Sequence, residues 1–329
     1  MSTAHRGTFH FGVEIELLLG SRKKHSTWTS LAEDLGKSLV KAGIPNHVNN
    51  SNDKTVPSNY REWSITQEIT IPSQPGKNLF GIELVSPIYD ASFRSQWVEE
   101  LSKIFSTLSS NFIITPSEHC STHIHISCVP TFSPTELASL SKCILYFEPA
   151  LDSLFPANRR GSSAYWCQSN RSNPALRGLS TGEALGIIDA AATTGSAARI
   201  IEVMNLFPAD SAYGRANGRR EDFVRGKVYK WDLTGLLGVT AGQVAREKPG
   251  FGIPSGTGGG NVRGTIEFRQ PPGSLTANEA VGGIEVAVSF VAGALMVGSI
   301  VERGREVLDA GGPREELWAL LASGAKMLG

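Results

Sequence analysis

Alternating apolar and polar residues predict several strands that are buried on one face. In residues 9–19, Phe11, Val13 and Ile15 share one side, whereas Glu14 and Glu16 lie on the other. A period of two is typical of a half-buried strand. We expect further strands at residues 63–71, 80–86, 122–129 and 265–270. The turn-rich segment PSQPGKN separates the first two of these and predicts a hairpin.

A spacing of three to four between apolar residues predicts helices between these strands. Such stripes run through residues 28–43 and 93–108, and the capping box from Ser133 to Glu136 opens a helix that ends near residue 151. Further helices are expected at residues 182–192 and 196–204, after Thr276 and after Pro313. Strands and helices follow one another without a βαβ rhythm, which favours an α+β fold with a mostly antiparallel sheet and helices on one side. No linker interrupts the chain, so residues 1–329 are predicted to form one domain with a core at about residues 9–300.

Composition argues against nucleic-acid and membrane partners and favours a cytoplasmic protein. The 31 basic and 31 acidic residues balance, which is not typical of a polybasic nucleic-acid binder. Residues 280–300 are mostly apolar but contain Glu285 and follow a capping box, so we expect a buried core helix and no membrane partner. The four cysteines lack CxxC spacing, and the N-terminal segment has no apolar signal region. We therefore expect a soluble, cytoplasmic protein.

The chemistry concentrates on the polar faces of four predicted strands. These faces carry, in order, Glu14 and Glu16, then Glu83, then His123 and His125, then Glu267 and Arg269. On any one strand such residues are ordinary solvated side chains, but carboxylates gathered on one face repel one another unless cations bind between them. Carboxylates with an occasional histidine suit Mg²⁺ or Mn²⁺, and a nearby arginine suits a phosphate bound to those metals.

Other chemistry is also compatible with single motifs. The spacing of His123 and His125 would suit zinc, with a glutamate as general base of a hydrolase, although the carboxylates outnumber the needs of zinc. Cys120 near His123 offers a weaker nucleophile–base pair. The glycine-rich residues 250–264 precede a strand and open no helix, so we interpret them as a loop and not as a phosphate-binding fingerprint.

Four segments together resemble a known family. FGVEIE, GIELVSP, THIHIS and TIEFRQPPGS, in this order and spacing, resemble the amidoligases of fungi and bacteria, carboxylate–amine ligases related to glutamine synthetase and γ-glutamylcysteine synthetase. The resemblance runs from about residue 9 to the helix after Thr276. It implies a curved antiparallel sheet, with helices on its convex side, whose concave face binds ATP and two or three divalent metals.

The same resemblance implies roles for individual residues. The metal ligands would be Glu14, Glu16, Glu83, His123 and Glu267. The nucleotide would be contacted by His125, Lys227 and Arg269, with Arg269 on the transferred phosphoryl group.

Two further segments resemble the fungal members but depart from their pattern. WSITQEITI has Glu68 where an aspartate is usual, and KVYKWDL has Asp232 where an asparagine is usual. A carboxylate at either position is a candidate to bind the substrate ammonium and accept its proton. The arginine-rich loop at residues 156–177 offers Arg159, Arg160 and Arg171 either to a substrate carboxylate or to solvent.

The expected function is ATP-dependent amide formation between a small carboxylic acid and an amine, amino acid or peptide. The acid would first become an acyl phosphate, and the products would be ADP and phosphate. Three alternatives stay open: a metal-dependent hydrolase, an ATP-independent amide-forming or cyclising enzyme on the same scaffold, and an inactive relative that only binds. Product formation without ATP would distinguish the first two from the ligase.

Overall fold

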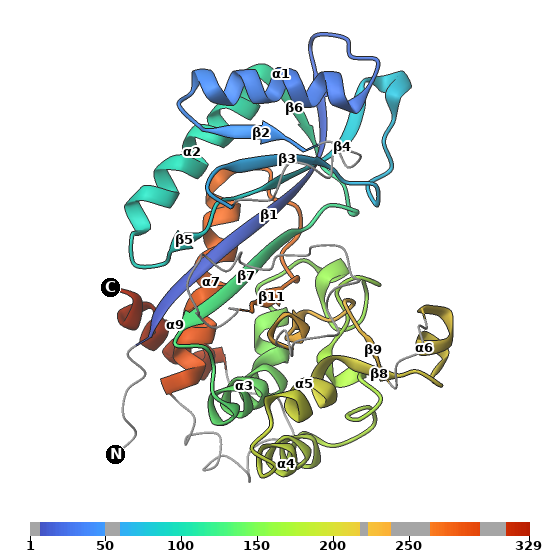
Figure 1. Cartoon of the computed structure of the whole chain (residues 1–329), viewed down its shortest axis with the longest axis vertical. Coiled ribbons are helices and arrows are strands. Elements are labelled where there is room, and N and C mark those ends of the chain that lie inside the picture. Colours follow the sequence, from blue (N-terminus) through green and yellow to red (C-terminus); the bar gives the residue numbers. More distant parts are fainter. Residues whose placement is uncertain (1–6, 50–59, 218–222, 238–263, 297–313) are drawn as a thin grey trace, which may run out of the picture. The chain divides into compact units, whose positions relative to one another are not determined.

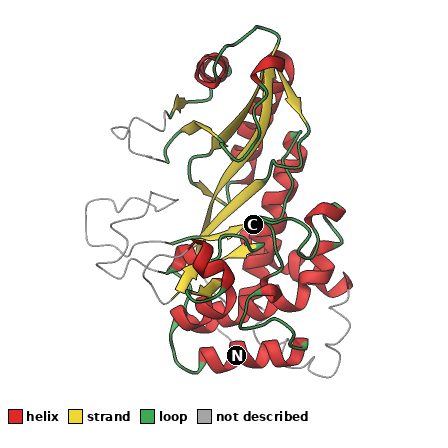
Figure 2. Ribbon diagram, turned by 90° about the vertical axis from the view of Figure 1, so that its right-hand side faces the viewer, coloured by secondary structure: helices red, strands yellow, loops and turns green. Residues whose placement is uncertain are grey.

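The chain folds into two compact units, each made of segments that are distant in sequence. The computed structural model describes residues 7–49, 60–217, 223–237, 264–296 and 314–329 (Figure 1). One unit, called the sheet unit here, consists of His10–Ile124 and Pro271–Val286. The other, called the helical unit, consists of Met1–Phe9, His125–Gln270 and Ala287–Gly329. More of the described strands belong to the first unit, and more of the described helices to the second. Figure 2 colours strands and helices separately.

The sheet unit is built around the long strand β1. Its elements are β1 (Thr8–Ser21), α1 (Trp28–Lys41), β2 (Asn46–Val48), β3 (Trp63–Gln67), a 3-10 turn (Pro75–Lys77), β4 (Leu79–Val85), β5 (Tyr89–Asp90), α2 (Arg94–Asn111) and β6 (Phe112–Thr115). Strand β1 pairs antiparallel with β4, β5 and β6, β4 pairs antiparallel with β3, and β2 pairs parallel with β3. The open, mostly antiparallel sheet confirms that part of the expected fold class.

Register sorts the residues of this sheet into apolar and polar rows. Ile15, Leu84 and Ile65 are direct cross-strand partners and are fully buried. Helix α1 packs against β3 and β4. At Gly36 an added Cβ would lie 2.8 Å from Asn46 Oδ1 and at ordinary contact distance, 3.5 Å, from Ile65 Cδ1. The next row along the strands belongs to the opposite face, because neighbouring residues of a strand point to opposite sides. The apolar row therefore anchors the sheet and leaves the polar row for chemistry.

The helical unit contains most of the remaining elements. They are α3 (Pro134–Asp152), two 3-10 turns (Ala157–Arg159 and Asn170–Ser172), α4 (Thr181–Ala192), α5 (Ala197–Asn205), β8 (Leu206–Pro208), α6 (Ala212–Asn217), β9 (Phe223–Arg225), β10 (Trp231–Asp232), a 3-10 turn (Thr234–Leu236), β11 (Ile266–Phe268) and α9 (Arg314–Leu328). Strand β10 pairs antiparallel with β11, and β8 with β9. The capping box of Ser133 and Glu136 is present at the start of α3, as predicted.

Three of the described elements run through both units. The first is β1, whose Thr8 and Phe9 belong to the helical unit. Strand β7 (Thr122–Val129) belongs to the sheet unit up to Ile124 and to the helical unit from His125 onward, and helix α7 (Ala277–Met296) divides after Val286. Helix α7 is long and apolar enough to cross a membrane, but 61% of its most apolar stretch is buried inside the protein. Burial of this kind is what the core helix of a soluble protein shows, in line with the sequence-based expectation.

Several expectations are refined by the structure. Strand β3 ends at Gln67, so Glu68 begins the connection to β4 and is not part of the strand. The short strands β2, β5, β6, β8 and β9 and the short helix α6 are additional to the predicted elements. Most of the glycine-rich segment 250–264 lies outside the described residues. The single domain over residues 1–329, the curvature of the sheet and the placement of helices on its convex side stay predictions.

Candidate active site

Three carboxylates of the sheet unit form an acidic cluster. Glu16 on β1 is the direct cross-strand partner of Glu83 on β4, and Glu68 follows the end of β3. One carboxylate oxygen from each of the three lies within 4.8 Å of the others. Antiparallel register brings Glu16 and Glu83 together, and the β3–β4 connection adds Glu68. The acidic cluster thus joins β1 to the β3–β4 hairpin, which lies further along the chain.

A histidine and a fourth carboxylate extend this cluster within the same unit. His123 Nδ1 on β7 lies 3.1 Å from Glu14 Oε2 and 3.8 Å from Glu16 Oε1. The other oxygen of Glu16 accepts a 2.7 Å hydrogen bond from the backbone N–H of Ser121. Four of the five predicted metal ligands are therefore gathered here, together with Glu68, which the sequence analysis assigned to the substrate amine.

The electrostatics of the acidic cluster are dominated by burial and like charge. The pKa of Glu83 is raised well above its ordinary value, mainly by burial and next by the carboxylate of Glu14, with further contributions from Glu16 and Glu68. A 2.9 Å hydrogen bond from the Thr66 hydroxyl acts in the opposite direction. One more negative charge is costly here, so the cluster favours either a proton or a cation.

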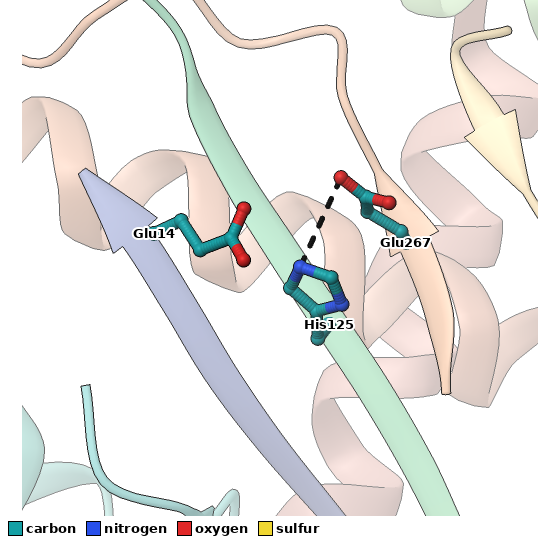
Figure 3. A group of neighbouring side chains, drawn as sticks. All are labelled: Glu14, His125 and Glu267. Atoms are coloured by element: carbon teal, nitrogen blue, oxygen red, sulfur yellow. Dashed lines mark ion pairs between the residues drawn. The ribbon is translucent and has the colours of Figure 1, made fainter. Parts of the chain in front are cut away.

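The second group of predicted residues lies in the helical unit. His125 on β7 places its Nε2 3.8 Å from Glu267 Oε1 on β11, and Figure 3 shows the imidazole directed towards that carboxylate. Figure 3 also draws Glu14 on β1. The guanidinium of Arg269 forms an ion pair with the same oxygen of Glu267. Asp232 is the cross-strand partner of Glu267 in the β10–β11 pair.

This second group joins a cation to two carboxylates in a buried setting. Asp232 and Glu267 are both buried. The pKa of Asp232 is raised, mainly by burial and next by the charge of Glu267, while hydrogen bonds from Thr234 and the charge of Arg269 act against this rise. A carboxyl group with a raised pKa is better suited to accept a proton near neutral pH than an ordinary aspartate.

Lys227 and Lys230 differ sharply in burial although only two residues separate them. Lys227, predicted to contact the nucleotide, is exposed on the turn that follows β9. Lys230 is 1% exposed and its ammonium donates to Glu148 Oε1 at 2.7 Å and to Asp152 Oδ1 at 2.5 Å. The sequence analysis did not select Lys230, because only the tertiary structure shows which lysine of this stretch is buried. The role of Lys227 stays a prediction.

Sequence reasoning also missed residues that support the site. Thr66 is the cross-strand partner of Glu83. It precedes Glu68 by two residues, so the strand period of two could have predicted from the sequence that Thr66 faces the same side. The three loop arginines bond within the protein: Arg159 to the carbonyls of residues 269 and 270, Arg160 to the carbonyl of Phe155, and Arg171 to Thr181 and Leu179. No pattern in the sequence distinguishes such internal braces from substrate-binding arginines.

The residues of the sheet unit fit a divalent cation of the hard class. Mg²⁺ and Mn²⁺ prefer carboxylate oxygens, and Mn²⁺ also accepts imidazole. The acidic cluster offers carboxylate oxygens at close spacing. The pKa of Glu83 is raised mainly by burial and next by Glu14, so its ionised form is costly and a bound cation would stabilise it. Thiolate ligands, which would favour zinc, are absent from the groups of possible metal ligands among the described residues.

Comparison with known proteins places this site in a family. A family model of amidoligase enzymes, Amidoligase_2, matches residues 8–177. The match spans more than half of the chain and includes β1, β4 and β7 with their ionisable residues. The chain belongs to this amidoligase family, and an amide-forming ligase is the class of enzyme that the family name indicates. No curated protein matches the chain.

Proposed function

We propose that this protein is an ATP-dependent carboxylate–amine ligase that forms an amide through an acyl phosphate. The observation that supports this most directly is the acidic cluster of Glu16, Glu68 and Glu83, because such a set needs cations and phosphoryl transfer uses them. Family membership supports amide formation. The relationship to glutamine synthetase and γ-glutamylcysteine synthetase is part of the proposal.

In this proposal the chain's own residues divide the work of the first step. Glu14, Glu16, Glu83 and His123 would hold Mg²⁺ or Mn²⁺ in the sheet unit, with Glu68 as an additional carboxylate. Bound cations would supply neutralisation of the polyphosphate charge. In the helical unit Glu267 would be a further ligand, His125 and Lys227 would contact the nucleotide, and Arg269 would hold the γ-phosphoryl group. A guanidinium suits that role because its planar fork matches phosphate oxygens.

The proposed reaction has two steps. An oxygen of the substrate carboxylate attacks the γ-phosphorus, the bond to the β–γ bridging oxygen breaks, and ADP leaves. The amine nitrogen then attacks the acyl carbon, and phosphate leaves with the electrons of the broken C–O bond. The amine must lose its proton for this attack. Asp232 would accept it, because its raised pKa makes it a stronger base than an ordinary aspartate.

A turnover assay tests the proposal. The protein is incubated with ATP, Mg²⁺ or Mn²⁺, and pools of amino acids and carboxylic acids, and ADP is resolved from AMP. We expect ADP and phosphate that depend on both an acid and an amine. AMP would indicate an adenylate intermediate and overturn the acyl-phosphate mechanism. Hydrolysis without ATP would favour a metal-dependent hydrolase, and amide formation without ATP would favour an ATP-independent amide-forming or cyclising enzyme.

Two variants test the ligand assignment separately. Calorimetry with Mn²⁺ and with nucleotide is compared for Glu14→Gln, Glu267→Gln and the unchanged protein. Loss of a ligand carboxylate should weaken binding in each variant. Full binding of metal and nucleotide by both variants would remove these residues from the ligand set.

Compartment and partners form part of the same proposal. All four cysteines are buried as free thiols, which supports a reducing compartment such as the cytoplasm. The proposed partners are a small carboxylic acid and an amine, amino acid or peptide, with no nucleic acid and no membrane. The clustered ionisable residues support small polar substrates of this kind.

A further inference from the structure

The backbone around Arg269 is held by buried polar groups outside the candidate active site. The N–H of Arg269 donates to the carbonyl of Lys230 at 2.8 Å. The carbonyl of Arg269 accepts a 2.6 Å hydrogen bond from Nη2 of Arg159, and the carbonyl of Gln270 accepts one of 2.9 Å from Nε of the same guanidinium. Arg159 is 4% exposed. One buried cation thus binds two successive carbonyls directly after β11.

A second layer holds this arrangement in place. The buried ammonium of Lys230 donates to Glu148 and Asp152 near the end of α3. The side-chain nitrogen of Gln270 donates to Asp152 Oδ1 at 2.6 Å and to the carbonyl of Arg159 at 3.1 Å. Asp152 therefore receives hydrogen bonds from both sides of the β10–β11 pair. Two cations and two carboxylates balance in this brace.

The brace ends at Arg269, whose guanidinium the proposed mechanism needs in a defined place. The Arg269 guanidinium reaches Glu267, and its Nε lies 3.4 Å from the carbonyl of Trp166. Burying charges carries a desolvation cost that apolar packing would avoid. These buried charges fix a few backbone atoms beside Arg269. They are therefore better suited to orienting the Arg269 side chain than to stabilising the fold alone.

We propose that Arg159 is a positioning residue: by holding the carbonyls of Arg269 and Gln270, it presents the Arg269 guanidinium to the γ-phosphoryl group of a bound nucleotide. Lys230 and Asp152 hold the same segment from its other side. The inference rests on the proposed function and deepens it, since it assigns the recognition of a nucleoside triphosphate over a diphosphate to this brace. Arg159 itself has no contact with the nucleotide in this view.

Selective binding of a triphosphate provides the test. Calorimetry in the presence of Mg²⁺ compares ADP with adenylyl imidodiphosphate, a non-hydrolysable ATP analogue, so no amine or acid substrate is needed. The proteins compared are the unchanged chain, Arg159→Met, Arg269→Met and the double variant. Arg171→Met is the matched control, because it removes the same type of side chain, whose guanidinium bonds Thr181 and Leu179 elsewhere in the same unit.

We expect the unchanged protein and Arg171→Met to bind the analogue more tightly than ADP by about tenfold. Arg269→Met should lose most of this preference. Arg159→Met should lose it as well while binding ADP normally, and the double variant should be no worse than Arg269→Met. That lack of additivity would show that Arg159 acts through Arg269.

Four results would overturn the inference. Arg159→Met with the full preference, or a double variant in which the two losses add, would leave the proposed function standing and remove the positioning role. Equal binding of the two nucleotides by the unchanged protein would remove Arg269 from the γ-phosphoryl group. Binding of neither nucleotide would overturn the proposed function and the inference together.

A conservative variant protects the test against misfolding. Arg159→Lys keeps the charge, but a single ammonium lacks the planar fork that reaches both carbonyls. We expect it to retain ADP binding with a reduced preference for the analogue. Hydrogen–deuterium exchange at the Arg269 amide, which donates to Lys230, should become faster in Arg159→Lys than in Arg171→Met. Unchanged exchange together with an unchanged preference would contradict the proposed brace.

Discussion

Among single residues, Glu83 combines burial with repulsion from neighbouring carboxylates, and both act in the same direction on its pKa. Its pKa is raised by burial and by Glu14, Glu16 and Glu68, and the Thr66 hydroxyl offsets only part of this rise. Such a carboxylate destabilises the cation-free protein when it is ionised and stabilises it when a cation is bound. A substitution of Glu83 should therefore change both the stability of the cation-free protein and its affinity for the proposed cation.

Glu83→Gln should separate these two effects. Amide and carboxylate have nearly the same shape, so the substitution removes a negative charge without a cavity. We expect Mn²⁺ affinity to fall by at least about tenfold, while the metal-free protein keeps its stability or gains some. Calorimetry and thermal unfolding measure the two quantities. The control is Glu118→Gln, an exposed position in the same unit that should change neither; unchanged Mn²⁺ affinity in Glu83→Gln would exclude it as a ligand.

Lys230→Met should be far more destabilising than Lys227→Met. Removal of the buried ammonium leaves Glu148 and Asp152 without their cation, a loss of about 3–5 kcal/mol in the free energy of unfolding. Lys227 is exposed, and its replacement should change that free energy by less than about 0.5 kcal/mol. Urea denaturation measures both. Similar losses in the two variants would show that the Lys230 ion pairs contribute little.

At the level of elements, the β3–β4 hairpin brings Glu68 to the acidic cluster. Strand register pairs Thr66 with Glu83, and the N–H of Glu68 then donates to the carbonyl of Gly81 at 3.3 Å. Gly81 packs so closely that an added Cβ would lie 2.5 Å from the carbonyl oxygen of Glu68 and 2.9 Å from Ile71 Cβ. The position of Glu68 therefore depends on the absence of a side chain on the neighbouring strand.

Gly81→Ala is expected to move the segment that carries Glu68. The overlap is with backbone and a β-carbon, which cannot rotate away, so we expect a loss of about 1–3 kcal/mol in stability and weaker Mn²⁺ binding. Gly76→Ala, in the 3-10 turn of the same connection, meets nothing within 4 Å and serves as the control. Denaturant titration and calorimetry test both variants. Normal Mn²⁺ affinity in Gly81→Ala would mean that Glu68 is not needed for the cation.

For the whole molecule, the buried carboxyl groups link stability to pH. Glu83 and Asp232 both have raised pKa values, so the folded chain binds more protons than the unfolded chain once the pH exceeds the ordinary carboxyl range. Stability from these groups is thus present at low pH and lost as the pH rises through their raised pKa values. A cation at the acidic cluster needs the ionised form of Glu83 and acts in the opposite direction.

The increase in the unfolding temperature caused by Mn²⁺ should therefore be larger at about pH 8 than at about pH 6. In the metal-free protein, the stability contributed by Glu83 and Asp232 should be lower at about pH 8 than at about pH 6. Scanning calorimetry with and without Mn²⁺ measures this increase at each pH. In Glu83→Gln the increase should depend less on pH. A larger increase at the lower pH would contradict a cation held by ionised Glu83.

Elements with strong periodicity could be predicted from the sequence, and weaker ones could not. Strand β7 has the predicted bounds, and the capping box at Ser133 opens α3 as expected. The three-residue strands β8 and β9 carry no periodic signal of their own, because their pairing with each other is decided by tertiary contacts. Glu68 was placed inside a strand that in fact ends at Gln67, since local pattern does not locate the end of a β ladder.

The sequence by itself determined which ionisable residues share a strand face, because the strand period of two follows from backbone geometry alone. It thereby selected Glu16, Glu83, His123, His125, Glu267 and Arg269, whereas Asp232 was selected only through the resemblance to the amidoligases. That resemblance agrees with the family match. Only the tertiary structure decided which carboxylates approach one another, and that Lys230 rather than Lys227 is buried. These facts depend on strand register and packing between distant segments, which no local pattern contains.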